Sequence, residues 1–184
     1  MKSLKTIQTL AKIGKILSRI IFIFCIVGFC GCIVGLIGIA LGADTLKFGH
    51  FILSDALQTE AQLNVGSIYT AMSVGMIFCI GEAVLAKIAE NYFKHELSRG
   101  TPFSFEGAKE MLSLGIFTIC IPIASQIAAA IVHTVVSKAM NGVAPLNLDN
   151  SGSISLGIMF IVMSVLCKYG AELTSERSAK GEEE

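Results

Sequence analysis

Glu82 is the residue whose surroundings in the sequence most suggest chemistry, because it is an acid inside a long apolar run. Small residues precede it at spacings of three and four, which places them on one helical stripe with the carboxylate. The members of this stripe are Ala71, Gly75, Cys79 and Glu82. Small residues let helices approach closely in a membrane, so the stripe directs Glu82 toward a neighbouring helix.

An ionised carboxylate inside a membrane requires a partner or water, and such acids are functional-site candidates by default. Lys168 lies in the last apolar run. The predicted spans place it at a membrane depth similar to that of Glu82. We therefore expect a Glu82–Lys168 ion pair, with Arg19 or Lys87 as alternative partners. The competing interpretation is a proton or cation site at Glu82.

The third apolar run carries its polar residues on one helical stripe. Pro122 frees a backbone carbonyl that neighbouring groups must satisfy, and the Gln126 amide should hydrogen-bond across helices. His133 is expected in the leaflet opposite Glu82, so we predict a hydrogen-bonded structural histidine and no Glu–His dyad. The candidate intramembrane polar residues are thus Glu82, Lys168, Gln126 and His133.

All six cysteines fall inside the apolar runs, which argues against a disulfide framework. Four of them come from four different runs at similar predicted depth, which leaves a four-thiolate metal site open. These four are Cys25, Cys79, Cys120 and Cys167. The spacing motifs of metal sites are absent and cysteine is a common small packing residue, so we expect no metal and no cofactor.

The composition describes a chain that is too apolar for a water-soluble domain. Hydrophobic residues make up 53% of the 184 residues and charged residues only 15%, and the mean hydropathy is +0.72. The formal net charge is zero, which excludes a nucleic-acid binder that relies on net positive charge. The sequence has no phosphate-binding glycine loop, zinc-protease motif or nucleophile elbow, so we expect no catalytic residue and no enzyme.

Four apolar runs are long enough to cross the roughly 30 Å hydrocarbon layer, which takes about 20 residues. The expected spans are 20–41, 66–86, 111–136 and 154–171. The predicted fold is therefore all-α, with a four-helix transmembrane bundle in a single integral membrane domain over residues 1–184. All basic residues except Lys47 and Lys138 fall on one side of these spans, so both termini and the middle loop should be cytoplasmic.

The segments outside the spans have their own predictions. Residues 1–19 are expected to form an amphipathic interfacial helix drawn to anionic lipid, and residues 174–184 a flexible tail. The apolar residues of 43–65 suggest a short helix on the membrane surface. Gly100 suits a left-handed helix end and Ser104 a helix N-cap, which predicts a cytoplasmic helical hairpin between the second and third spans.

Five glycines of the first span alternate at spacings of three and four, which is a seven-residue repeat on one helix face. They are Gly28, Gly31, Gly35, Gly38 and Gly42. Together with Ala71 and Gly75 of the second span they predict a helix-packing seam. Packing within the bundle is the favoured interpretation, and homodimerisation is the alternative.

Two short motifs carry a resemblance to a known family. They are Gly100-Thr101-Pro102-Phe103-Ser104 and Cys167-Lys168-Tyr169-Gly170-Ala171-Glu172-Leu173. With them the chain resembles a bacterial family of small four-helix membrane proteins, classed as a domain of unknown function and often encoded beside a helix-turn-helix regulator. The resemblance implies a bacterial inner-membrane location and no established catalytic residues. The acidic segment that follows the second motif in that family is only partly matched here, by Thr174, Ser175 and Glu176.

The expected function is that of a non-enzymatic membrane component for interaction, signalling or regulation. Its partner would be a cytosolic regulatory protein, as the resemblance implies. The alternative is a small transporter, channel subunit or self-protection protein that acts as a homo-oligomer. The lipid bilayer is the partner that the composition implies directly, and no direct nucleic-acid binding is expected.

Overall fold

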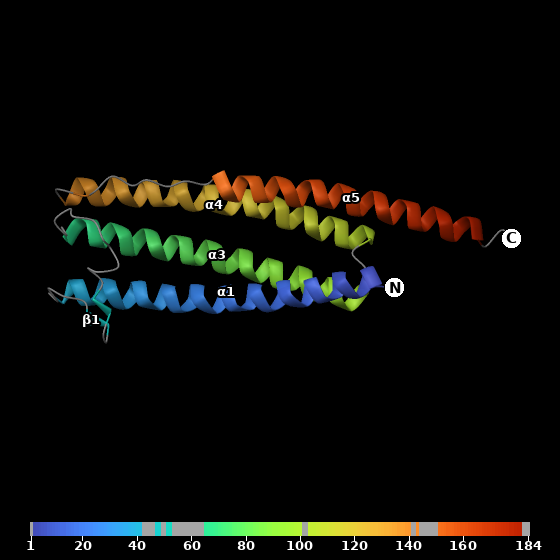
Figure 1. Ribbon diagram of the computed structural model, residues 1–184. Coiled ribbons are helices and arrows are strands. Elements are labelled where there is room, and N and C mark those ends of the chain that lie inside the picture. The colour runs from blue at the N-terminus through green and yellow to red at the C-terminus, as the bar shows by residue number, and fades with distance from the viewer. Residues whose placement is uncertain are drawn as a thin grey trace. The chain divides into compact units, whose positions relative to one another are not determined.

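Four long helices make up the structure, a computed structural model of the chain (Figure 1). They are α1 (Lys2–Ala40), α3 (Val65–Arg99), α4 (Phe105–Ala139) and α5 (Ser151–Gly181). The structure describes residues 2–41, 47–48, 51–52, 65–100, 103–140, 143 and 151–181. Each of the four helices is long and apolar enough to cross a membrane. The prediction of an all-α protein with four helices of this kind is confirmed.

α1 joins two segments that the sequence separates. The sequence predicts an interfacial helix over 1–19 and a span over 20–41, but Lys2–Ala40 is one uninterrupted helix. No proline falls in this stretch to break the backbone hydrogen bonding. The structure therefore shows no separate arm that could turn into the membrane surface.

α5 extends beyond the predicted end of the last span. The sequence predicts this end at residue 171 and a flexible tail over 174–184, but the helix continues through Gly181. The added stretch contains Glu, Leu, Arg, Ala and Lys, which favour helix. Residues 182–184 lie outside the described part of the chain.

A short strand pair occupies part of the segment between α1 and α3. β1 (Lys47–Phe48) and β2 (Phe51–Ile52) pair antiparallel, with Phe48 opposite Phe51. The prediction of a surface helix over 43–65 is therefore wrong for these four residues. Aromatic and β-branched residues, which suggest an apolar helix face, also favour strands. Most of the remaining segment lies outside the described residues.

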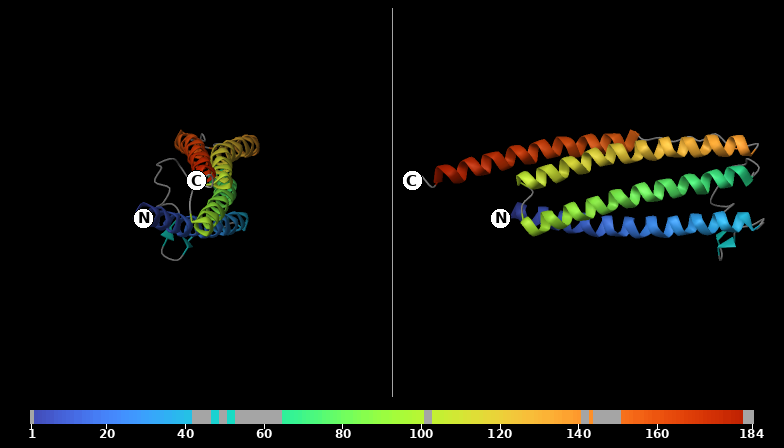
Figure 2. Two further views of the ribbon diagram at one scale, coloured as in Figure 1. Left: turned by 90° about the vertical axis from the view of Figure 1, so that its right-hand side faces the viewer. Right: turned by 180° about the vertical axis from the view of Figure 1, so that it is seen from behind.

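The chain divides into two compact units. The first unit comprises Met1–Ile23, Glu82–Ile123 and Asp149–Glu184, and the second comprises Phe24–Gly81 and Ala124–Leu148. α1, α3 and α4 contribute one part to each unit, and α5 belongs to the first. The helices can be followed from two further directions in Figure 2.

In the first unit, α4 and α5 touch backbone to backbone. A Cβ atom at Gly157 would lie 2.9 Å from the Gly115 carbonyl oxygen and would overlap the Ile119 side chain. A Cβ atom at Gly115 would lie 3.0 Å from the Gly157 carbonyl oxygen. Ser164 Oγ on α5 also donates a 2.8 Å hydrogen bond to the Ala108 carbonyl oxygen on α4. The two helices therefore approach closely because glycine leaves the necessary space.

This contact determines the level at which α5 lies along α4. Gly157 faces Gly115 and Ile119, and Ser151 precedes Gly157 by six residues. At a rise of 1.5 Å per residue, Ser151 lies about 9 Å farther along, near the level of Pro122. α5 thus packs along the first half of α4 and is displaced toward the end at which α4 begins.

In the second unit, α1 and α3 pack antiparallel through small residues. The facing pairs are Gly28 with Cys79, Cys32 with Gly75, and Gly35 with Met72. A Cβ atom added at any of these three glycines would lie 3.1–3.2 Å from the facing sulfur. Each step of four or three residues along α1 is matched by an equal step back along α3. Gly28, Gly35 and Gly75 therefore lie at close contacts between these two helices.

Not every predicted member of the seam takes part in this contact. A Cβ atom at Gly31 would meet nothing within 4 Å, and Ala71 is exposed. On α1, the contact position between Gly28 and Gly35 is occupied by Cys32 and not by Gly31. The steps of four and three residues from Gly28 to Cys32 and from Cys32 to Gly35 keep all three on one helix face. Gly38 is half-buried on α1, and Gly42 lies outside the described residues.

We expect Gly157→Ala to weaken the α4–α5 contact, because the added methyl group cannot be placed without moving the α4 backbone. The expected loss in unfolding free energy in detergent micelles is about 1–3 kcal/mol, the range for overpacked cores. Gly152→Ala is the matched control on the same helix, because a Cβ atom there meets nothing within 4 Å. It should leave the protein unchanged or stabilise it by up to about 1 kcal/mol. Equal stability of the two variants would contradict the close contact.

Candidate functional site

Residues 101–102 lie outside the described part of the chain, and the structure describes how α3 ends before them and how α4 begins after them. α3 ends at Arg99, and Gly100 follows with a φ of 76°, a left-handed conformation that favours glycine. The Gly100 N–H donates a 3.0 Å hydrogen bond to the Glu96 carbonyl oxygen. At the start of α4, the Gly107 N–H donates a 3.0 Å hydrogen bond to Ser104 Oγ, as expected for a helix cap.

Arg99 joins the two helices across this turn. Its guanidinium makes two hydrogen bonds to the Glu110 carboxylate, with Nη2–Oε1 at 2.9 Å and Nη1–Oε2 at 3.3 Å. Nη2 also lies 3.2 Å from Glu106 Oε2. A planar guanidinium fits a carboxylate through two parallel bonds, and the side chains of Arg99 and Glu110 are only 24% and 31% exposed. The pair is therefore less screened than a typical surface ion pair.

Glu110 has a second partner on α3. His95 Nδ1 lies 3.0 Å from Glu110 Oε1, within hydrogen-bond distance. Burial by itself would raise the pKa of Glu110, but the hydrogen bonds from Arg99 and His95 and the charge of Arg99 hold this pKa below its usual value. Glu110 precedes the predicted third span, and its carboxylate stays ionised to lower pH than an ordinary glutamate does.

A further pair of polar groups lies before Arg99 on α3, beyond the predicted second span. Burial raises the pKa of the Tyr92 hydroxyl, and the nearby Glu96 carboxylate adds to this effect. Burial also raises the pKa of Glu96, against the opposing effect of a hydrogen bond from Tyr92. Tyr92 therefore keeps its proton at neutral pH and donates a hydrogen bond to Glu96.

Aromatic side chains pack around the turn. Tyr92 is only 6% exposed, and its ring centroid lies 5.3 Å from that of Phe93 in an edge-on arrangement. Phe93 occupies the space beside Gly14 of α1, where a Cβ atom would lie 2.6 Å from the ring. A Cβ atom at Gly170 of α5 would likewise lie 2.6 Å from the Phe103 ring. Both α1 and α5 therefore hold this end of the unit through a contact between a glycine and an aromatic ring.

The turn also presents apolar rings beside charge. Phe103 is 47% exposed and Phe105 is 51% exposed, while the Glu106 side chain is 80% exposed. Aromatic side chains are enriched among residues that contribute most to protein–protein binding. This end of the α3–α4 pair therefore presents exposed rings next to a carboxylate.

The structure does not bring Glu82 and Lys168 together. Both are exposed, and neither belongs to an ion pair among the described residues. The contact of Gly170 with Phe103 places Lys168 near the turn, whereas Glu82 precedes Arg99 by seventeen residues, about 25 Å along α3. The expected pair is absent because α5 is displaced toward the turn, so equal positions in the predicted spans are not equal depths.

The two alternative partners of Glu82 bind a different acid. Lys87 Nζ donates a 2.9 Å hydrogen bond to Glu90 Oε2, and Arg19 Nε lies 3.9 Å from Glu90 Oε1. Sequence reasoning does not identify Glu90. Its spacing of three residues from Lys87 on a helix is the signal that could have revealed it.

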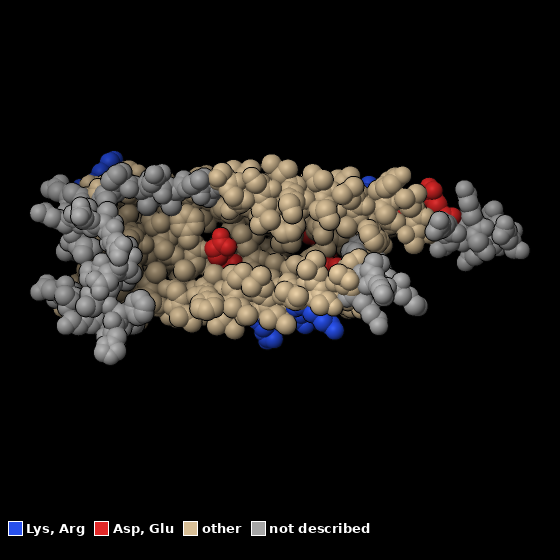
Figure 3. All heavy atoms as spheres, viewed as in Figure 1, with Lys and Arg blue, Asp and Glu red and all other residues tan. Residues whose placement is uncertain are grey.

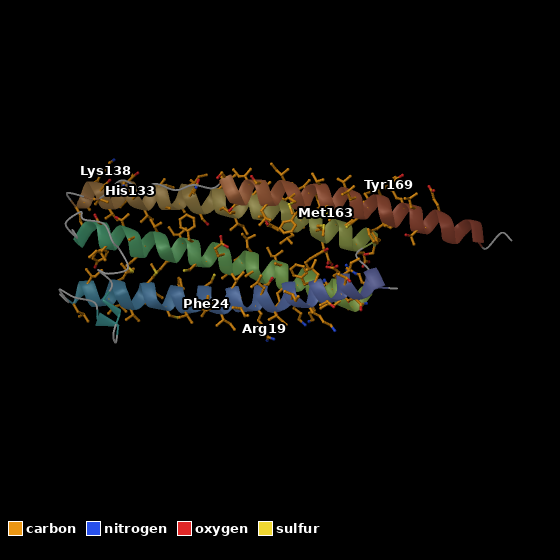
Figure 4. The ribbon with its side chains drawn as sticks, viewed as in Figure 1. Arg19, Phe24, His133, Lys138, Met163 and Tyr169 are labelled. Atoms are coloured by element: carbon orange, nitrogen blue, oxygen red, sulfur yellow. The ribbon has the colours of Figure 1, made fainter. Side chains whose placement is uncertain are left out.

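Gln126 and His133 are half-buried on α4 in the second unit, whereas Glu82 and Lys168 belong to the first. Each of the two takes part in at least one non-covalent interaction within the structure. Figure 4 marks His133 near the C-terminal end of α4, close to Lys138. The four predicted polar residues are therefore distributed over two units.

The part of the chain that the structure describes contains no group of three or more His, Cys, Asp or Glu side chains placed to hold a metal ion. All six cysteines lie in this part, and none of them forms a disulfide. The four-thiolate site that the sequence leaves open is not formed there.

Comparison of the chain with family models, with curated proteins and with solved structures found no match in any of the three. The candidate site is a junction of two helices that presents aromatic rings and carboxylates.

Glu110→Gln should destabilise the protein at neutral pH, because it weakens the bonds from Arg99 and His95. The expected loss of unfolding free energy in detergent is about 1.5–3 kcal/mol, the range for hydrogen bonds to charged groups. A carboxylate with a lowered pKa stabilises above the ordinary glutamate pKa of about 4.3, and this contribution is lost as the pH falls through the lower folded-state value. The difference from the unmodified protein should therefore shrink toward pH 3.

Glu106→Gln is the matched control, because the Glu106 side chain is 80% exposed. It should change stability by no more than about 0.5 kcal/mol. A Glu110→Gln variant that matches the unmodified protein at pH 7, or that stays equally destabilised at pH 3, would contradict the role assigned to this ion pair.

Proposed function

We propose that this chain is a non-enzymatic, multi-pass membrane protein whose α3–α4 turn binds a cytosolic partner. The observation that carries the proposal is the combination of exposed Phe103 and Phe105 with a turn held by the Arg99–Glu110 bonds. A surface that is already ordered loses little conformational freedom on binding. Exposed aromatic rings supply the apolar area that a partner can bury.

The distribution of basic residues indicates on which side of the membrane the turn lies. All of them except Lys47 and Lys138 fall on the side of the turn and the two termini, and such a bias is typical of cytoplasmic segments. Four helices that can each cross a membrane support this arrangement, because an even number returns the chain to its starting side. A soluble regulator in a bacterial cell is the partner that the family resemblance favours.

Photo-crosslinking in intact cells tests this function. A crosslinking amino acid in place of Phe105 should give a discrete adduct with a soluble protein. The matched control replaces Ile127 of α4, an apolar residue that is 58% exposed in the other unit and should contact lipid. Arg99→Gln combined with the first replacement should reduce the adduct several-fold, because the turn is no longer held in place.

The proposal is wrong if the crosslinker at position 105 gives no adduct with a soluble protein. It is also wrong if the same adduct forms from position 127, because the partner would then not recognise the turn.

A further inference from the structure

One carboxylate in the first unit is surrounded by bases from two helices. Glu90 of α3 accepts a 2.9 Å hydrogen bond from Lys87 Nζ, and its other oxygen lies 3.9 Å from Arg19 Nε of α1. The Glu90 side chain is 12% exposed, whereas the side chains of Arg19 and Lys87 are 70% and 54% exposed. A separation of 3.9 Å is longer than a hydrogen bond, so Glu90 leaves the Arg19 donors to other acceptors.

The positive charge here exceeds what Glu90 can neutralise. Lys15 precedes Arg19 by one turn on the same face of α1, and Lys12 lies one turn farther back. No acidic residue occurs in the whole of Lys2–Ala40. Figure 3 shows Lys and Arg side chains, in blue, gathered along α1. The cluster therefore carries a net positive charge that faces outward.

The cluster lies where both helices change from apolar to charged. Arg19 is the last charged residue before the apolar run 20–41, and Lys87 is the first basic residue after the run 66–86. Lys87 Nζ also lies 5.7 Å from the ring centroid of Phe22, which links the basic level to the apolar one. In a bilayer this boundary is the level of the lipid phosphates.

We propose that Arg19, Lys87 and Lys15 bind the headgroup phosphate of an anionic phospholipid. Guanidinium and ammonium groups both bind phosphate, and basic clusters at this level attract anionic lipid. Ile20 and Ile23 are 43% and 55% exposed and give the acyl chains an apolar surface next to the bases. The inference rests on the membrane placement in the proposed function and is independent of the cytosolic partner. Figure 4 shows Arg19 projecting from α1 at this level.

Native mass spectrometry of the full chain in detergent tests the site by titration with phosphatidylglycerol or phosphatidylcholine. The unmodified protein should prefer phosphatidylglycerol, and Arg19→Gln with Lys87→Gln should weaken its binding about tenfold or more. The matched control combines Lys138→Gln with Lys168→Gln, which removes two exposed bases elsewhere and should change binding less than about twofold. Equal losses in the two double variants, or no loss in the first, would overturn the headgroup site.

Glu90→Gln tests the site with every base retained. It should tighten phosphatidylglycerol binding about threefold or more, because the cluster loses its acid, and unchanged or weaker binding would overturn the proposal. Displacement of the bound lipid by millimolar inorganic phosphate would also overturn it, because the site would then select phosphate alone. Reconstitution into phosphatidylcholine nanodiscs tests membrane placement separately, so a failure of lipid selectivity can be distinguished from a failure of placement.

Discussion

Close approach of helix backbones at small residues is the interaction on which the rest of this structure depends. Lipid tails are as apolar as leucine, so helices in a membrane associate through van der Waals packing and hydrogen bonds between them. The first unit supplies both, with Gly115 against Gly157 and the hydrogen bond from Ser164 to the Ala108 carbonyl oxygen. Many large apolar side chains are exposed, such as Leu166 of α5 at 55%. This exposure suits contact with lipid and differs from the buried core of a water-soluble protein.

The register set by this contact determines which polar groups meet. Because α5 lies along the first half of α4, Gly170 comes to rest against Phe103 and supports the turn from one side. Gly14 of α1 supports Phe93 in the same manner. A turn held by two helices can keep Arg99 in a partly buried geometry, and that geometry lets its charge act on Glu110 with little screening. Helix packing thus determines the strength of the Arg99–Glu110 ion pair.

The features that the sequence predicts correctly depend on neighbours along the chain. The four helices follow from apolar runs. The left-handed residue after α3 follows from the conformational freedom of Gly100, and the start of α4 from the capping ability of Ser104. Gly28 and Gly35, seven residues apart, lie on the face of α1 that meets α3. Each of these signals is local, so a single sequence contains it.

The features that the sequence misses depend on how far one helix slides along another. The Glu82–Lys168 pair requires equal depth, and the Gly115–Gly157 contact sets a different level for α5. Glu90 is missed for a related reason, because its Arg19 partner becomes visible only once the α1–α3 register is known. Sliding by one turn moves a side chain about 5.4 Å and changes every partner, while the apolar pattern of each helix stays the same.

We propose that the ion-paired α3–α4 turn lies on the cytoplasmic side of a multi-pass membrane protein. Labelling by a membrane-impermeant maleimide tests this placement, in a background whose six cysteines are changed to alanine or serine. Glu106→Cys should react only after the membrane is opened, and Lys138→Cys should react in intact cells, because these residues stand at opposite ends of α4. The reverse pattern, or reaction of both cysteines from the same side, would contradict the cytoplasmic placement of the turn.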